Sequence, residues 1–202
     1  MTVAHVEVLV EEPSMETALR SLLPKIVNDM SFEIYPHQGK EALLHRLPGR
    51  LQGYRKFLPD NWRVVVLVDR DADDCSELKE RLEVITRDAG LRTRAASGPS
   101  FQVLTRIVVE ALESWYFGDW TAVRKAYPKL PATLPAQANY RTPDAIRRPS
   151  EALERVMKRA GYFPGGLRKL EIARRIGPLM DPDRNTSRSF HVLRHALGAF
   201  TA

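Results

Sequence analysis

Two short apolar runs in this chain each end in acidic residues, and this pattern constrains the fold more than any other feature of the sequence. Residues 6–10 lead into Glu11 and Glu12, and residues 63–68 lead into Asp69. Continuous β-branched runs of this length are typical of parallel strands that are buried on both faces. In open α/β sheets, ligands bind at the carboxyl ends of the strands. The two runs therefore predict an α/β fold, with a mostly parallel sheet flanked by helices and one acidic site at its carboxyl edge.

The acidic residues after the second run are spaced in a way that suits a hard divalent cation. Asp69, Asp71 and Asp73 alternate along the chain just past the strand end, where a turn can bring their carboxylates together. Mg²⁺ and Mn²⁺ prefer oxygen ligands, and Mg²⁺ takes only one or two protein carboxylates, which leaves room for a substrate phosphate. We therefore predict that these three residues bind Mg²⁺ or Mn²⁺.

Glutamates from the other predicted strand ends extend this hypothesis. Glu11 or Glu12 would supply a further ligand or act as a general base, and the sequence favours neither over the other. Glu113 lies beyond a third predicted strand, one helical turn after Glu110, where it would assist a second ion. Two metal ions about 4 Å apart can activate water and stabilise the leaving oxygen of a phosphodiester. The predicted catalytic residues are Glu11, Glu12, Asp69 and Asp71, and the predicted metal ligands are Glu11, Asp69, Asp71, Asp73 and Glu113.

The acidic residues also have two alternative interpretations, and both stay open. Helix capping would account for one or two of them, because Asp74 and Glu77 have the spacing of a capping box. The alternating aspartates also resemble a calcium-binding loop. However, Asp74 stands where such a loop needs a glycine, and a strand precedes it in place of a helix.

Hydrophobic periodicity predicts alternating strands and helices up to about residue 118, which is typical of a parallel α/β core. The expected strands are residues 5–10, 32–35, 63–68, 91–95 and 102–109. The expected helices are residues 15–27, a broken helical region at 39–57 interrupted by Pro48 and Gly49, a helix after Asp74, a helix carrying Glu110 and Glu113, and helices near 150–160, 168–177 and the end of the chain. We predict an α/β core at 1–126, a proline-rich connection at 127–149 and a basic helical appendage packed on the core at 150–202.

Composition excludes several classes of protein. The chain has 202 residues and no stretch of about 18 consecutive apolar residues, so no membrane span is expected. The single cysteine, Cys75, excludes an internal disulfide and a cysteine-based zinc site. The first residues lack a basic region followed by an apolar one, so we expect no secretory signal and a cytoplasmic location.

The positive charge of the chain is concentrated in its last third. The formal net charge is +6, and residues 141–202 contain 13 Lys and Arg against 6 Asp and Glu. A basic surface beside a metal site suits a polyanion such as DNA or RNA, although basic helices can also be merely solvated. We predict that backbone phosphates bind to the basic residues Arg147, Arg148, Lys158, Arg159, Arg168, Lys169, Arg174 and Arg175.

Several of these stretches resemble a known family. Residues 9–16 (LVEEPSME), 66–75 (VLVDRDADDC) and 110–119 (EALESWYFGD) are similar to the Toprim-like domain-of-unknown-function family 4276. The stretches around residues 148–150 and 185–190 extend the resemblance over nearly the whole chain. The strand-end glutamate followed by a later Asp-x-Asp pair also resembles the Toprim domain of topoisomerases, primases and OLD-type nucleases. The resemblance implies a Toprim-like sheet for the α/β core.

The same resemblance implies roles for individual residues. In Toprim enzymes, the strand-end glutamate is a metal ligand or a proton-transfer group and the Asp-x-Asp pair binds metal, which implies these roles for Glu11, Asp69 and Asp71. Glu12 stands where a glycine is usual in Toprim domains. Members of the family resemble components of bacterial phage-defence systems that often lie beside an ATPase, which implies an ATPase partner.

We therefore predict a Mg²⁺- or Mn²⁺-dependent nuclease of Toprim type, in a bacterial defence context. One alternative is a non-catalytic adaptor or regulatory subunit that binds metal and nucleic acid beside a partner ATPase. Another is phosphoryl transfer on a small nucleotide.

Two weaker features have both a structural and a functional interpretation. The aromatic cluster at residues 115–120 could stack nucleic-acid bases, but its helical spacing favours the protein core. The polar turn at residues 181–189 could contact phosphate, or it could simply cap a helix.

Overall fold

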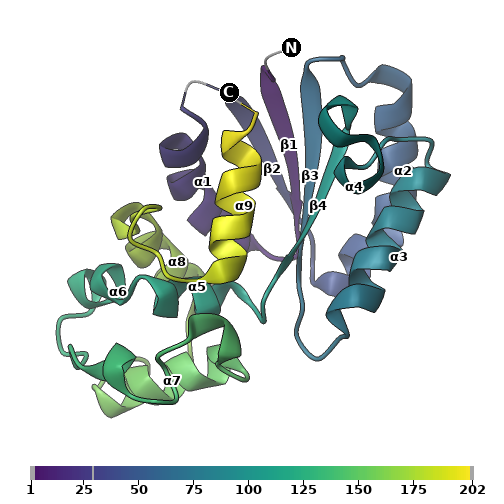
Figure 1. Ribbon diagram of the computed structural model, residues 1–202. Helices are drawn as coiled ribbons and strands as arrows, with labels where there is room; N and C mark the ends of the chain where they lie inside the picture. Colours follow the sequence, from purple (N-terminus) through teal and green to yellow (C-terminus); the bar gives the residue numbers. More distant parts are fainter. Residues whose placement is uncertain (1–2, 29, 201–202) are drawn as a thin grey trace.

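The computed structural model describes residues 3–28 and 30–200, and its centre is a four-stranded sheet in which all neighbouring strands are parallel (Figure 1). The strand order is β2-β1-β3-β4. The strands are β1 (His5–Val10), β2 (Ser31–Pro36), β3 (Trp62–Asp69) and β4 (Val103–Val108). The predicted α/β fold with a mostly parallel sheet flanked by helices is confirmed.

Helices cover both faces of the sheet, which explains why its central strands are continuously apolar. Alternate residues of β3 enter two separate hydrophobic clusters: Val65 and Leu67 enter one, while Val64 and Val66 enter the other. On the second face lie α2 (Lys40–Phe57) and α3 (Cys75–Asp88), and on the first lie α1 (Pro13–Val27) and α9 (Arg188–Gly198) (Figure 1). A strand between two apolar layers has no solvent-facing side and therefore needs no polar alternation.

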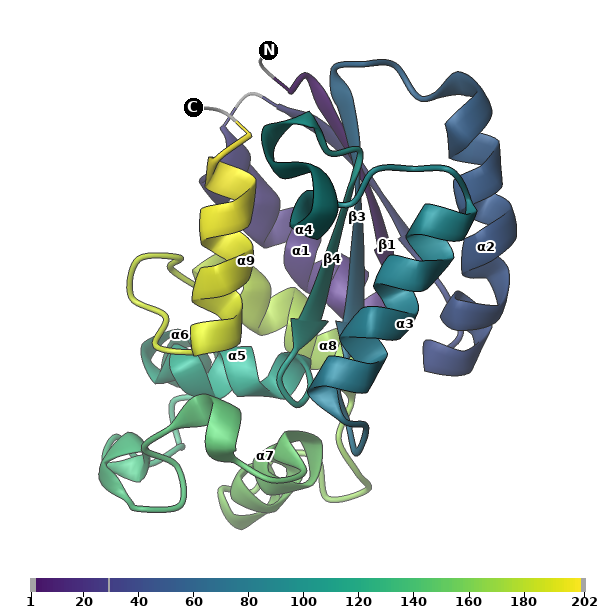
Figure 2. The same ribbon diagram turned by 45° about the vertical axis from the view of Figure 1, so that its right-hand side comes forward.

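The remaining helices are short and gather mainly beyond the carboxyl ends of the strands, where Figure 2 shows α5, α7 and α8. They are α4 (Arg94–Ser97), α5 (Leu112–Gly118), α6 (Trp120–Ala126), α7 (Pro149–Arg159) and α8 (Lys169–Ile176), with single 3₁₀ turns η1 (Gly98–Ser100), η2 (Leu134–Ala136), η3 (Pro143–Ala145) and η4 (Gly177–Leu179). Apolar residues of α5 to α9 belong to the same hydrophobic cluster as α1 and the first face of the sheet. The helical segment and the sheet therefore share one core.

The strand order produces a crevice at the carboxyl edge between β1 and β3. After β1 the chain enters α1 on one face of the sheet, and after β3 it enters α3 on the other face. The two connections diverge and leave space between the strand ends. Such a topological switch point is the usual ligand site of an open α/β sheet.

One long helix, α2, replaces the broken helical region predicted at residues 39–57, so that prediction is wrong. Pro48 lies inside α2, where a proline costs roughly 3 kcal/mol or more. However, Leu43, Leu47 and Leu51 are fully buried against the sheet, and each contributes roughly 1.5–3 kcal/mol. Their combined burial outweighs the cost of the proline, and the helix continues through it.

Two further local predictions need correction. Residues 91–95 do not form a strand: Thr93 makes one isolated bridge to Val103, and its hydroxyl then accepts a hydrogen bond from the N–H of Ala96 at the start of α4. The predicted helix at Glu110 and Glu113 begins only at Leu112, because Ala111 is extended (φ −157°). Glu113 therefore lies in the first helical turn, whereas Glu110 lies in the loop before it.

The aromatic cluster at residues 115–120 is part of the core. Trp115, Tyr116, Phe117 and Trp120 are each at most 5% exposed. Phe117 and Trp120 stack with ring centroids 5.7 Å apart. The structural interpretation of this cluster is confirmed, and none of the four rings is free to stack on a base.

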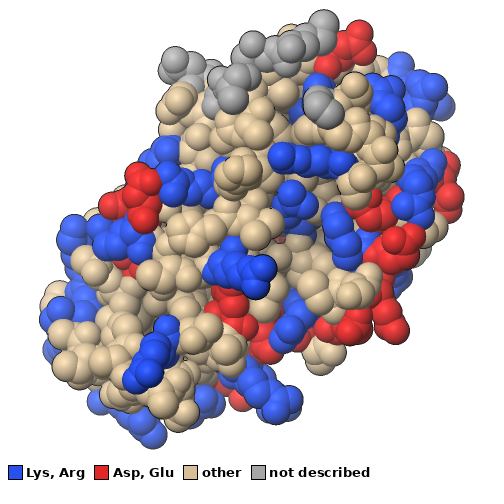
Figure 3. Space-filling model, in the orientation of Figure 1, with Lys and Arg blue, Asp and Glu red and all other residues tan. Residues whose placement is uncertain are grey.

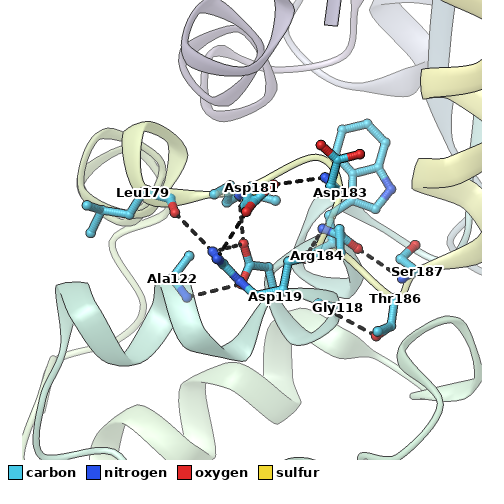
Figure 4. Close-up of polar contacts among 12 residues, drawn as sticks. Gly118, Asp119, Ala122, Leu179, Asp181, Asp183, Arg184, Thr186 and Ser187 are labelled. Atoms are coloured by element: carbon cyan, nitrogen blue, oxygen red, sulfur yellow. Dashed lines mark hydrogen bonds and ion pairs between the residues drawn. The ribbon is translucent and has the colours of Figure 1, made fainter. Parts of the chain in front are cut away.

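An ion pair between the buried Asp119 and Arg184 links the polar turn before α9 to the start of α6 (Figure 4). Asp119 is 1% exposed, and Arg184 donates to both of its oxygens, from Nε at 2.7 Å and from Nη2 at 2.8 Å. Asp119 also accepts hydrogen bonds from the backbone N–H groups of Ala122 and Asp181. Four donors therefore satisfy this buried carboxylate, in a bidentate geometry that is among the strongest for such pairs.

The rest of the turn also makes structural contacts. Asn185 donates from Nδ2 to the carbonyl of Trp115 at 2.9 Å, and Ser187 caps α9 by accepting from the N–H of Phe190. Gly118 approaches this turn so closely that a Cβ there would lie 2.2 Å from the Asn185 Oδ1. The interpretation of residues 181–189 as a capped turn is therefore the one that the structure supports.

Replacing Arg184 should destabilise the fold strongly. Arg184→Gln leaves the buried Asp119 carboxylate without its charged partner, which should lower the free energy of unfolding by about 2–4 kcal/mol. The matched control is Arg194→Gln, because Arg194 pairs with Asp183, whose side chain is 80% exposed. That variant should change the free energy by about 0.5 kcal/mol or less. Urea unfolding measures both, and equal losses would contradict the structural role of Arg184.

Candidate metal-dependent active site

A cavity of about 1490 Å³ opens at the carboxyl edge of the sheet, at the crevice between β1 and β3. Its acidic lining residues come from the ends of β1 and β3, from the loops that follow β1, β3 and β4, and from α7. Its basic lining residues come from α2, α8, the loop after β3 and the loop before α7. The charged side chains of the lining are Glu11, Glu12, Lys40, Asp69, Arg70, Asp71, Asp73, Asp74, Glu110, Arg147, Arg148, Glu151 and Lys169.

Glu11 and Asp69 form the floor of this cavity. The backbone N–H of Asp69 donates to the Glu11 Oε1 at 2.6 Å, and the two residues are 8% and 6% exposed. Burial raises the pKa of Glu11 to about 7, although the hydrogen bond from Asp69 acts in the opposite direction. Burial and the nearby charge of Glu11 raise the pKa of Asp69 well above its usual value. The two carboxyl groups thus repel each other in a poorly solvated place.

Lys40 neutralises the two aspartates that follow. Its Nζ lies 2.9 Å from the Asp71 Oδ2 and 2.9 Å from the Asp73 Oδ2, and it donates to the carbonyl of Arg70 at 3.0 Å. Asp71 has a left-handed backbone (φ 51°), a conformation that aspartate tolerates better than most residues. Partial burial lowers the pKa of Lys40, but the bonds to Asp73 and Asp71 outweigh it and the pKa is raised.

Lys169 plays the same part for Glu12 and Glu113 that Lys40 plays for the two aspartates. Its Nζ donates to the Glu12 Oε1 at 2.9 Å and lies 4.0 Å from the Glu113 Oε1. Glu113 is 3% exposed and is not part of the cavity lining, whereas its neighbour Lys169 is. Burial raises the pKa of Glu113, and the charge of Lys169 opposes this shift.

Glu110 connects the floor to the helical segment. It forms an ion pair with Arg70, and its Oε2 accepts a hydrogen bond from the backbone N–H of Arg148 at 2.9 Å. Its carbonyl accepts from the N–H of Asp71. Although Glu110 does not share a helix with Glu113, it fixes both the loop after β3 and the start of α7.

Glu11, Asp69 and Asp71 are the residues that could hold a divalent cation. The Oδ1 of Asp69 and the Oε2 of Glu113 have no hydrogen-bond partner among the described residues, and burial raises the pKa of both carboxyl groups. Within residues 3–28 and 30–200, however, no group of three or more His, Cys, Asp or Glu side chains has the arrangement needed to hold a metal ion. The ammonium groups of Lys40 and Lys169 hold Asp71, Asp73 and Glu12 instead. A carboxylate floor with an unpartnered oxygen fits a hard cation.

The predicted nucleic-acid residues fall into two groups. Arg147, Arg148 and Lys169 line the cavity. The other five lie away from it along α7 and α8 or just before α8, where three of them pair with acidic residues close by in the sequence. These five are Lys158, Arg159, Arg168, Arg174 and Arg175. Lys158 lies 2.6 Å from Glu154, and Arg168 and Arg175 each lie 3.4 Å from Glu171.

Sequence analysis missed Lys40 and His37 as cavity residues. His37 is 6% exposed and its Nδ1 lies 2.9 Å from the carbonyl of Val10. Both residues follow β2, whose carboxyl end lies beside that of β1. The strand-end rule that found Glu11 and Asp69 would also have found these two residues.

Comparisons with known proteins place the chain in a family. The model of "Domain of unknown function (DUF4276)" matches residues 10–198. The chain belongs to this family. The resemblance found in its motifs is therefore confirmed.

A solved structure is also similar to this DUF4276 chain. It is the C-terminal region of the OLD protein of Xanthomonas campestris pv. campestris, with a TM-score of 0.47 and 16% sequence identity, covering 98% of this chain and 97% of that chain. No curated protein is a significant match. Among the described residues, no helix has both the length and the apolar character to cross a membrane.

The floor of the cavity should make stability depend on pH when divalent ions are chelated. Because the pKa of Glu11 is raised from 4.5 to about 7, its ionisation in the folded state destabilises the protein as the pH rises through this interval. Glu11→Gln keeps the acceptor for the Asp69 N–H and removes the charge. It should be more stable than the wild type by roughly 1–3 kcal/mol at pH 8 and nearly equal to it at pH 4.

Urea unfolding in chelator at pH 4 and pH 8 measures this effect. The exposed Glu80→Gln variant is the control and should gain no stability at pH 8. A Glu11→Gln variant no more stable than the wild type at pH 8 would contradict the unfavourable burial of this charge.

Proposed function

We propose that this DUF4276 protein is a Mg²⁺- or Mn²⁺-dependent nuclease that hydrolyses phosphodiester bonds. The observation that carries the proposal is the convergence of Glu11 and Asp69, from adjacent strands, at a cavity with an acidic floor and a basic rim. A phosphodiester has a negative charge and can approach such a floor only if cations stand between the two. The acidic floor is an argument for a divalent ion at this place, and the basic rim is an argument for a polyanionic substrate.

Five side chains of the cavity have a role in this proposal. Asp69 and Asp71 hold the cation, which when bound supplies Lewis-acid activation of water and of the phosphate. Glu11, with a pKa of about 7, accepts a proton from the attacking water. Lys40 and Lys169 contribute positive charge at the two sides of the floor, and the burial of the floor keeps these interactions poorly screened.

The wider context of the proposal rests on the resemblance of this chain to Toprim and OLD-type proteins. That context is bacterial phage defence, with DNA or RNA as the substrate and an ATPase as the partner. A non-catalytic adaptor is the second candidate, and one observation favours it: Lys40 and Lys169 already neutralise Asp71, Asp73 and Glu12 without a metal.

Removing the two aspartates should abolish cleavage. Asp69→Ala with Asp71→Ala takes away the carboxylates proposed to hold the cation, so metal-dependent cleavage should fall by at least about 100-fold. Plasmid, single-stranded DNA and RNA are incubated with Mn²⁺ or with chelator, and the products are resolved on gels. Circular dichroism verifies that the variant is folded.

Glu80→Ala with Asp88→Ala is the matched control, because both residues are exposed on α3 and neither lines the cavity. This variant should cleave like the wild type. Cleavage that persists in the Asp69 and Asp71 variant would overturn the mechanism. Nucleic-acid binding without cleavage by the wild-type protein in Mn²⁺ would favour the adaptor.

The rim arginines should contribute to nucleic-acid affinity more than the distant ones. Arg147→Gln with Arg148→Gln removes two charges beside the cavity, whereas Arg159→Gln with Arg174→Gln removes two exposed charges away from it. The first variant should bind nucleic acid several-fold more weakly and have a salt slope smaller by about 2. Fluorescence anisotropy across a series of salt concentrations measures both, and equal losses would show that the rim is not the contact surface.

A further inference from the structure

A second hollow lies at the opposite edge of the sheet, beside the amino ends of β3 and β4. It has a volume of about 720 Å³, within the range of small-molecule pockets. Its charged lining residues are Asp60, Arg63, Arg92 and Arg94, and part of its apolar lining comes from Phe101 and Phe200. Figure 3 shows basic side chains on this face of the molecule, over the region between α4 and α9.

The three arginines of this hollow have no carboxylate partner within 4.0 Å among the residues that the structure describes. Each is held by backbone carbonyls instead. Arg63 donates from Nη1 to the carbonyls of Asp60 and Trp62 at 2.7 Å each, and Arg92 donates from Nε to Ser100. Arg94 donates from Nη1 to Ala196 at 3.1 Å. These bonds orient the guanidinium groups, and Asp60, the one acidic residue among the described residues of the lining, offsets only part of their charge.

Arg63 is the most unusual of the three. It is only 7% exposed, although it lies at the start of a strand, and its Nε has no hydrogen-bond partner among the described residues. Its guanidinium carbon lies 5.3 Å from the centre of the Phe101 ring, and that of Arg94 lies 5.6 Å from the same ring. Phe101 therefore contacts two guanidinium groups of the hollow through its ring.

We propose that this hollow binds a small molecule that carries a phosphate monoester. Three guanidinium groups and the carboxylate of Asp60 leave a net charge of about +2, which matches a phosphate monoester, whose charge is about −1.5 to −2 at pH 7. Guanidinium groups form paired hydrogen bonds with phosphate oxygens. The apolar lining at Val3, Phe101, Ala199 and Phe200 provides a surface for the carbon portion of the ligand.

This site is separate from the acidic cavity. Arg63 and Asp69 belong to the same strand and are six residues apart, which corresponds to about 20 Å along β3. A small molecule cannot reach both ends of that strand. The proposal therefore does not depend on the nuclease function.

Isothermal titration calorimetry in chelator tests this site with adenosine 5′-monophosphate as the probe and adenosine as the matched control. The phosphate compound should bind and adenosine should not. Arg92→Gln with Arg94→Gln should raise the Kd by about tenfold or more, because it removes two charged donors. Arg87→Gln with Arg155→Gln removes two exposed arginines elsewhere and should leave the Kd within about twofold.

A second variant keeps the test valid if the arginine variant fails to fold. Ser100→Glu retains all three arginines and adds a carboxylate to the hollow, which should also weaken binding about tenfold. The proposal fails if the wild type does not bind the nucleotide at millimolar concentration, or if the control variant loses as much affinity. It also fails if only a 5′-phosphorylated oligonucleotide binds, since the site would then recognise a nucleic-acid end.

Discussion

The hydrogen bond from the backbone N–H of Asp69 to the carboxylate of Glu11 is the contact on which the candidate site depends. It joins the carboxyl ends of β1 and β3 at the point where the chain turns toward opposite faces of the sheet. Because both residues are buried, their charges are poorly screened, and this burial is the largest cause of their raised pKa values. Lys40 pairs with Asp71 and Asp73, and Lys169 pairs with Glu12, whereas the Asp69 Oδ1 has no hydrogen-bond partner among the described residues.

The helical segment after β4 completes this arrangement. It contributes Lys169 from α8 and two arginines at the rim of the cavity, and the backbone of Arg148 fixes Glu110. The ion pair between the buried Asp119 and the partly exposed Arg184 holds the turn before α9 against the start of α6. The helical segment that carries the rim shares one hydrophobic core with the sheet that carries the floor.

Much of the fold could be predicted because the relevant information is local. The apolar run that became β3 is continuous because two helical layers cover it, and the Asp74 cap of α3 depends on neighbours two and three residues away. The prediction at residues 39–57 was wrong because it weighed Pro48 without the leucines that the sheet buries. The proximity of Glu11 and Asp69 followed from a general rule about strand ends, and the same rule applied to β2 would have placed Lys40 beside them. The ion pairs of Lys40 with Asp71 and Asp73 did not follow from that rule, because they depend on side-chain positions in the folded chain.

The sequence by itself determined the class of fold, the acidic residues at the strand ends and the family of the chain. These depend on patterns within a few residues, which hydrophobic periodicity and local hydrogen bonding control. Only the tertiary structure decided which charges face one another. Lys169 pairs with Glu12, 157 positions away in the sequence, and Arg63 and Arg94 of the second hollow lie over the Phe101 ring without an ion-pair partner among the described residues. Electrostatic energy depends on distance in space and on burial, and neither quantity can be calculated from the order of residues along the chain.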